Sequence, residues 1–237
     1  MKGFEGSRGQ GFEGKKPIGR TQEERTVGIS GRLGMTSTML NDTIENLLRA
    51  PAELKNKLPR DLKVIERAGI EKTLSLCPDF FHRLLGQLRK ADAARVFNDV
   101  PGVADELAEL LWAGIGHQAR RTKDLRSLLA KAEREMHVNI EASDSPFQTH
   151  FIVTGGTIQG GAGLLHFKDE DFRFMGPTQT LIGLFLGDLP LGFHNLELQT
   201  SGHSGWMSRI GPIMREISKV LRGRPQAPQR KEKRRAA

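Results

Sequence analysis

Two hydrophobic periodicities follow one another along the chain, and their order limits the fold more than any other feature. Between residues 36 and 137, apolar side chains recur at spacings of three and four, which is the periodicity of amphipathic helices. After Pro146 the pattern changes to short runs rich in β-branched and aromatic residues. Helices that precede strands, rather than alternate with them, predict an α+β fold instead of a doubly wound sheet.

Five apolar stripes divide the first region into five expected helices. They comprise Leu40, Ile44, Leu47 and Leu48; Leu62, Ile65 and Ile70; Phe81, Leu84, Leu85 and Leu88; Val103, Leu107, Leu110 and Leu111; and Leu125, Leu128, Leu129, Ala132 and Met136. Pro51 is expected to end the first helix, and Gly114 and Gly116 the fourth. Such stripes are ordinary core faces, so they predict a helical layer.

The second region contains shorter segments. Strands are expected at 147–154, 164–168 and 172–175, a short buried helix at 178–186, a further strand around Leu196 and Leu198, and an amphipathic helix from Ile210 to Leu221. Glycine pairs and an acidic turn separate the strands, which predicts a small antiparallel sheet. We expect the last helix to cover one face of that sheet, because its apolar stripe is the clearest in the chain.

The two ends differ from the middle in composition. Residues 1–34 are rich in Gly, Arg and Gln and poor in aliphatic residues, so they cannot bury enough apolar surface to offset their chain entropy. A disordered arm is predicted there, and a disordered basic tail at 223–237. One α+β domain is expected between them at 35–222, with its helical part at 36–137 and its β-rich part at 147–222.

The positive charge is concentrated at these ends. Residues 209–237 contain ten Lys and Arg but two Glu, so their net charge equals the formal charge of +8 of the whole chain. Residues 1–34 are also basic, and the middle of the chain is therefore slightly acidic. A dense cationic strip attracts polyanions by releasing counterions, which gives binding that lacks sequence preference and weakens with salt.

Contact with nucleic acid is accordingly the leading hypothesis. The expected phosphate-binding residues are Arg222, Arg224, Arg230, Lys231, Lys233, Arg234 and Arg235 in the tail, together with Arg120, Arg121 and Lys123. The last three would follow a bend at 114–116 if residues 103–129 formed a helix-turn-helix. Asp124 interrupts that positive face, however, and a solvated helix surface explains the same residues. The chain has no Tyr, which argues against a dedicated single-strand binder.

Catalytic and metal-binding motifs are not supported by the sequence. The segment 202–206 resembles a G-x-S-x-G nucleophile elbow, but Trp206 stands where the turn needs a small residue. The seven histidines form neither H-E-x-x-H nor a pair at i, i+4, so neither a metal nor a cofactor is expected. Cys77 is the single cysteine; it excludes an intrachain disulfide and is interpreted as a small buried hydrophobe.

Three functional hypotheses follow. The first is a non-enzymatic protein associated with nucleic acid, with RNA slightly preferred because the Arg/Gly-rich arm suits shape-tolerant binding; viruses and mobile elements offer analogies. The second is an adaptor that binds a protein through Phe4 and Phe12, which lie in two copies of Gly-Phe-Glu-Gly, or through an exposed stripe at residues 107–111. The third is an enzyme whose site gathers distant residues.

The candidate members of such an enzymatic site are His150, His166, His203 and Ser204. Strand parity would place His150 and His166 on one polar face if their two strands paired. A solvated sheet face explains both histidines equally well.

The sequence also predicts where the protein resides. The longest apolar stretch, at 181–186, is far shorter than a membrane span, and residues 1–30 contain no apolar signal core. A soluble intracellular protein is expected, either cytoplasmic or, in a eukaryotic host, nuclear, because the basic tail resembles a nuclear localisation signal. The oligomeric state stays open.

Overall fold

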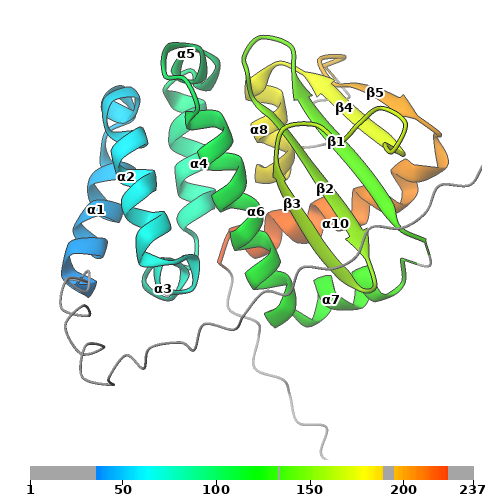
Figure 1. Ribbon diagram of the computed structural model, residues 1–237, viewed down its shortest axis with the longest axis horizontal. Coiled ribbons are helices and arrows are strands. Elements are labelled where there is room, and N and C mark those ends of the chain that lie inside the picture. The colour runs from blue at the N-terminus through cyan, green and yellow to red at the C-terminus, as the bar shows by residue number, and fades with distance from the viewer. Residues whose placement is uncertain (1–35, 133, 189–194, 224–237) are drawn as a thin grey trace, which may run out of the picture. The chain divides into compact units, whose positions relative to one another are not determined.

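The computed structural model describes residues 36–132, 134–188 and 195–223 (Figure 1). Its helical part comprises α1 (Ser37–Arg49), the 3-10 helix η2 (Pro51–Glu53), α2 (Leu54–Ala68), α3 (Ile70–Leu76), α4 (Phe80–Lys90), α5 (Ala93–Asp99), α6 (Val103–Arg121) and α7 (Lys123–Ala130). The remainder comprises β1 (Met136–Ala142), β2 (Gln148–Thr154), β3 (Thr157–Ala162), β4 (Phe172–Gly176), α8 (Thr178–Leu186), β5 (Gln199–Gly202) and α10 (Gly205–Leu221). The predicted α+β fold is confirmed.

The structure describes almost none of the residues predicted to form the two disordered ends. The arm at 1–34 and all but the first residue of the tail at 223–237 lie outside the described residues. Within the described part of the chain, no helix is both long and apolar enough to cross a membrane.

Helix α6 is longer than its sequence pattern predicts. We expected it to end near Gly114 and Gly116, but it continues to Arg121. The glycines instead allow close packing: a Cβ on Gly114 would lie 2.3 Å from Cε2 of Phe81, and one on Gly116 would lie 3.5 Å from the carbonyl oxygen of Ile158. Glycine in this helix therefore marks contact with its neighbours and not a terminus.

The stripe at 107–111 on α6 belongs to the core. Leu107 and Leu111 are fully buried, and Leu110 is 9% exposed. The hypothesis that this stripe is an exposed docking surface is therefore wrong. α6 contacts β2, β3, α2 and α3, which cover its apolar residues, while Asp105, Glu109 and Arg120 form an exposed polar stripe.

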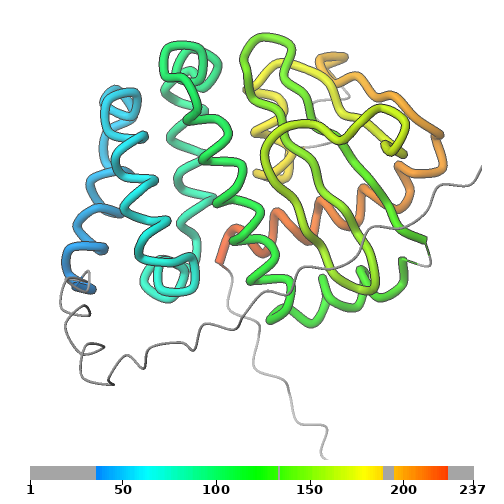
Figure 2. The backbone as a smooth tube through the Cα atoms, in the orientation of Figure 1, coloured from blue at the N-terminus to red at the C-terminus, as the bar shows by residue number. Residues whose placement is uncertain are grey.

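Within the described residues, the sheet has five strands in the order β3-β2-β1-β4-β5. All neighbouring pairs are antiparallel except β1 and β4, which are parallel, with Val138 opposite Phe172. The sheet is therefore mixed and not wholly antiparallel as predicted. The direction of β4 follows from residues 163–171, which cross the sheet and bring the chain back to the end at which β1 began (Figure 2).

The crossing connection contains the segment at 164–168, where we expected a strand. The backbone N–H of Leu165 donates to Oδ1 of Asn139 at 2.8 Å, and its carbonyl accepts from Nδ2 of Asn139 at 3.1 Å. A side-chain amide thus satisfies the backbone groups that a neighbouring strand would have bonded. The predicted strand is wrong for this reason.

The hairpin between β2 and β3 confirms the interpretation of Gly155 and Gly156 as a turn. Both have positive φ, at +56° and +76°, as a two-residue type I′ turn requires. Gly160 and Gly161 lie within β3 instead of in a turn, and a Cβ on Gly160 would lie 2.5 Å from the Trp112 side chain of α6.

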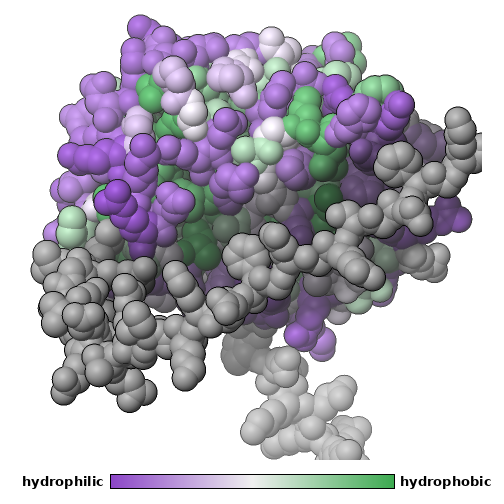
Figure 3. Space-filling view, viewed as in Figure 1, coloured by the Kyte–Doolittle hydropathy of each residue, from purple (hydrophilic) through white to green (hydrophobic). Residues whose placement is uncertain are grey.

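The two faces of the sheet differ in polarity. Helices cover one face, where Val138, Ile140, Phe151 and Phe174 are fully buried, and α10 passes behind the sheet as Figure 1 shows. The predicted helix at 178–186 and the predicted covering helix at the end of the domain are both present, as α8 and α10. Where the opposite side is visible in Figure 3, hydrophilic residues dominate and hydrophobic ones appear in narrow patches.

Candidate ligand-binding groove

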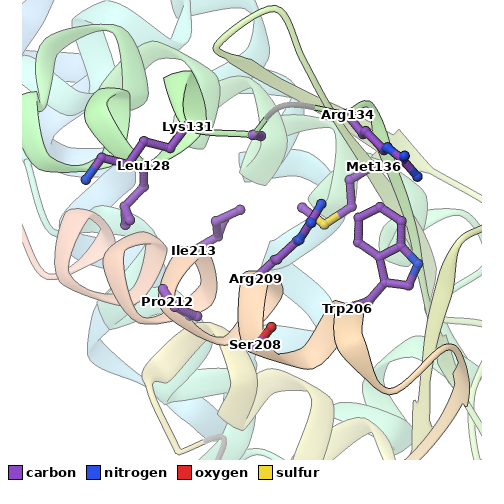
Figure 4. A pocket seen from close by; sticks show the side chains of 10 residues that line it. Leu128, Lys131, Arg134, Met136, Trp206, Ser208, Arg209, Pro212 and Ile213 are labelled. Carbon is purple, nitrogen blue, oxygen red and sulfur yellow. The ribbon is translucent and has the colours of Figure 1, made fainter.

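A groove lies between α7, the segment before β1, and the first half of α10 (Figure 4). Its cavity measures about 290 Å³. The lining residues are Leu128, Lys131, Ala132, Arg134, Met136, Trp206, Ser208, Arg209, Pro212 and Ile213. We call this the α7–α10 groove.

Ordinary helix geometry places the lining residues. On α7, Leu125 and Leu129 are buried in the core, whereas Leu128 is half-buried and borders the cavity. On α10, Arg209 and Ile213 are four residues apart and so lie on the same side of the helix. The two helices contact one another, and both border the same cavity.

The floor of the groove is apolar. Met136, at the start of β1, is 1% exposed and Ile213 is 4% exposed, and both point into the space that Leu128 borders in Figure 4. Trp206 contributes a half-buried indole from the first turn of α10. The hydroxyl of Ser208 donates to the carbonyl of Gly205 at 2.8 Å, which leaves the apolar surface as the main feature of this floor.

The rim of the groove is cationic. Lys131, Arg134 and Arg209 are all exposed, and no acidic side chain among the described residues lines the cavity. Among the described residues, none of the three takes part in a salt bridge. The guanidinium carbon of Arg209 lies 5.3 Å from the centroid of the Trp206 ring, which is within cation–π range.

A second cavity of about 360 Å³ adjoins the first. It is lined by Arg134, His203, Gly205, Trp206 and Arg209, three of which also line the first cavity. The two are therefore chambers of one groove, and we call them the apolar chamber and the cationic chamber.

His203 is held in one orientation in the cationic chamber. Its Nδ1 accepts the backbone N–H of Gly205 at 3.1 Å. In the neutral ring the proton is therefore on Nε2, which remains a donor. The groove as a whole can enclose an apolar body beside a negatively charged group, because each chamber supplies one of the two environments.

The predicted basic residues near α7 are arranged differently from a helix-turn-helix. Because α6 is continuous through residues 114–116, Arg120 and Arg121 lie in α6 itself, and Lys123 begins α7. Arg121 contacts the His117 ring at 3.2 Å and lies 3.7 Å from Glu71. Burial, followed by the charge of Arg121, lowers the pKa of His117 below its usual value.

Arg222 is the one tail cation within the described residues. It donates to the carbonyl oxygen of Leu186 at 2.7 Å and so joins the end of α10 to the end of α8. The other predicted binding residues lie outside the described residues; they are Phe4, Phe12, Arg224, Arg230, Lys231, Lys233, Arg234 and Arg235.

The histidines of the enzyme hypothesis are not neighbours in paired strands. His150 lies in β2 and its Nδ1–H donates to the carbonyl of Gly163 at 3.0 Å. His166 lies in the crossing connection, where its ring contacts Phe167 at 4.7 Å between centroids. His203 and Ser204 stand before α10, and of these residues His203 alone lines the groove. The described part of the chain contains no cluster of three metal-ligating side chains.

Sequence reasoning missed Arg134, Arg209 and the role of Trp206. Arg134 falls in a non-periodic segment, and the sequence pattern uses Trp206 only to exclude a nucleophile elbow at 202–206. The spacing of three between Trp206 and Arg209 is a signal that could have been used, because it places a cation beside an aromatic ring on one helix face.

Comparison with known proteins gives weak likenesses. No known family model matches the sequence, and no curated protein matches it significantly. Among solved structures, the chain is similar to sterol carrier protein 2 from Yarrowia lipolytica in its apo form, with a TM-score of 0.34 and 14% identity over 54% of this chain and 97% of that one. It is also similar to the stereoselective inverting sec-alkylsulfatase Pisa1 from Pseudomonas sp., with a TM-score of 0.32 and 11% identity over 75% of this chain and 29% of that one. At such scores neither likeness assigns a ligand or an activity.

Proposed function

We propose that this protein binds an amphipathic small molecule with an anionic head group, and that it acts by binding without a chemical step. The observation that carries the proposal is one groove with an apolar chamber and an adjoining cationic chamber, which the described part of the chain lines with three basic side chains and no acidic one.

Two physical arguments support this ligand class. Apolar surface in a cavity gains free energy when a hydrocarbon replaces water, so the floor favours an apolar ligand body. Cations with no partner carboxylate gain when an anion approaches them beside a low-dielectric wall. A wholly apolar ligand would not gain from the cations, and a small free anion would not gain from the apolar floor.

Intrinsic fluorescence provides a direct test. The chain contains two tryptophans, and Trp112 is buried, with its indole N–H donating to Thr149 at 2.6 Å. Titration with dodecanoate below its micelle concentration should change the emission of Trp206 saturably, and Trp206→Phe should abolish that change.

Paired variants separate binding in the groove from adsorption elsewhere. Leu128→Asp introduces a charge into the apolar chamber and should weaken dodecanoate binding about tenfold or more. Leu76→Asp is the matched control, because Leu76 is 39% exposed and does not line the groove. Equal affinities in both variants, or the absence of saturable binding in the unaltered chain, would show the proposal to be wrong.

We propose association with nucleic acid, preferably RNA, as a second candidate function. The concentration of ten Lys and Arg in residues 209–237 supports it. Trp206 is a poor platform for base stacking, because the guanidinium of Arg209 already lies over its ring. The tail would therefore supply the contacts with phosphates.

A salt series tests this second candidate. Labelled single-stranded RNA and duplex DNA are titrated with the full chain and with a chain that ends at Leu221. The affinity should fall steeply with salt and should collapse on truncation, because the tail cations release counterions on binding. If neither ligand binds the full chain at low salt, the second candidate is excluded.

A further inference from the structure

We infer that the head group taken by the α7–α10 groove is a phosphate monoester held between Arg134 and Arg209. This inference rests on the proposed function and names the chemical class of its ligand. The juxtaposition that carries it is that two arginines, from separate elements of the fold, line one cavity of about 360 Å³.

The two arginines that line the cationic chamber come from different elements of the fold. Arg134 precedes β1, and Arg209 projects from α10 (Figure 4). Each guanidinium can bind two oxygens of one anion in a fixed planar geometry. A carboxylate has two oxygens and satisfies one such fork, whereas the three terminal oxygens of a phosphate monoester can bridge two forks.

Charge points to the same head group. A phosphate monoester carries between one and two negative charges near pH 7, and the chamber offers two permanent cations, with no carboxylate among its described lining residues. His203 adds a further donor at Nε2, because its Nδ1 is occupied by the N–H of Gly205. A single carboxylate would leave at least one of these groups without a partner.

Side chains, and not the start of α10, supply the recognition. The backbone N–H of Gly205 donates to the His203 ring, that of Trp206 to the carbonyl of His203, and that of Met207 to the carbonyl of Ser204. These N–H groups are therefore already bonded within the protein. The selectivity of the groove for a head group should depend on the arginines.

Lys131 offers a matched control in the same groove. It lines the apolar chamber but not the cationic one, whereas Arg134 lines both. Lys131→Gln and Arg134→Gln each remove one exposed cation from the rim. A general electrostatic attraction would respond equally to both changes, and a phosphate clamp would respond to Arg134→Gln.

The experiment measures calorimetric binding of dodecyl phosphate, dodecanoate and inorganic phosphate to the full chain and to both variants. Dodecyl phosphate should bind about tenfold more tightly than dodecanoate. Arg134→Gln should weaken dodecyl phosphate binding more than dodecanoate binding and so remove most of that preference, and Lys131→Gln should preserve the preference. Thermal unfolding confirms that both variants are folded.

The possible results separate the inference from the proposed function. If both dodecyl ligands bind with equal affinity, or if the two variants behave alike, the phosphate clamp is wrong while the amphiphile groove stands. If neither dodecyl ligand binds, the proposed function itself is wrong. Inorganic phosphate that binds as tightly as dodecyl phosphate, with the same dependence on Arg134, would identify a free-phosphate site and overturn the amphipathic ligand.

Discussion

The absence of one methyl group at Gly114 lets the ring of Phe81, from α4, lie directly against α6. Gly114 faces the ring of Phe81, which is 1% exposed and so has little room to move. The ring occupies the space that any Cβ at position 114 would need. Glycine at position 114 therefore has a packing role, which its low helix propensity alone would not indicate.

We predict that Gly114→Ala destabilises the protein by about 1–3 kcal/mol, because the added methyl group overpacks the core against Phe81. Denaturant unfolding measures the change. Gly86→Ala is the matched control, since position 86 also lies in a helix and a Cβ added there would meet no neighbouring group within 4 Å. The control should gain roughly 0.5–1 kcal/mol from helix propensity. A stability gain in both variants would contradict the packing role.

Glycine illustrates what the sequence could not reveal at this scale. Gly155 and Gly156 were correctly interpreted as a hairpin turn, because two adjacent glycines between strand patterns have few other uses. Gly114 and Gly116 were wrongly interpreted as a helix end. In a sequence, a glycine that ends a helix cannot be distinguished from one that allows another side chain to pack closely against the helix. The distinction depends on Phe81, more than thirty residues earlier in the chain.

At the scale of elements, one buried amide fixes the crossing connection to the sheet. Asn139 in β1 is fully buried, and besides its two bonds with Leu165 it donates to a carboxylate oxygen of Glu170 at 2.5 Å. Glu170 also pairs with Arg173, whose second partner is Glu141. The connection is therefore held by a polar network, in which each buried group has a partner.

We predict that Asn139→Ala costs about 1–3 kcal/mol of stability, because it leaves the backbone groups of Leu165 without their partner. Hydrogen exchange gives the more specific measurement: the amide of Leu165 should lose its protection while amides in β2 keep theirs. Gln159→Ala, at an exposed position on β3, should change neither quantity appreciably. Unchanged protection at Leu165 in Asn139→Ala would refute the role assigned to this amide.

Amphipathic elements were predictable, and this connection was not. The stripes of α1, α4 and α10 follow from spacings of three and four, which need no knowledge of the partner. The stripe predicted from Leu125 to Met136 is correct only as far as the end of α7 at Ala130, because Met136 begins β1. The segment at 164–168 has a strand-like composition, but its backbone bonds go to a side chain 26 residues earlier. Local pattern cannot contain that information.

At the scale of the whole molecule, His82 links stability to pH. It lies in α4, and its buried Nδ1 has no hydrogen-bond partner among the described residues. Burial, and then the positive charge of Arg222, lower the pKa of His82 below the ordinary value of 6.5. Unfolding therefore takes up a proton at this site in mildly acidic solution, so stability should fall as the pH drops through 6.5.

We predict that Arg222→Gln raises the pKa of His82 and reduces the loss of stability between about pH 7 and pH 5. Arg222→Gln also removes the bond to Leu186, so its stability at pH 7 should be lower, and the slope with pH is the informative quantity. Proton NMR of the His82 ring reports the pKa directly. Arg215→Gln, on an exposed position of the same helix, is the control and should leave the titration of His82 unchanged. Equal pKa values in the two variants would contradict the assigned cause.

The fold class was predictable from the sequence, whereas the groove was not. The change from helical to strand periodicity needs no long-range contact to be recognised. The groove brings residues 128–136 together with 206–213, and the two segments share no pattern that marks them as neighbours. The sequence shows that these cations are present but not that they lack partner carboxylates, because pairing depends on the folded structure.

The outer strands of the described sheet also determine how this protein can meet other copies of itself. At one edge, β3 packs against α6, and its Ala162 N–H donates to the carboxylate of Glu109 at 2.9 Å. At the other edge, β5 has four residues, all exposed and none of them apolar. A strand from another molecule could not pair with β3, whose edge is covered by α6, and would pair poorly with β5, which is short and polar. Edge-to-edge association of two copies through this sheet is therefore disfavoured at both described edges.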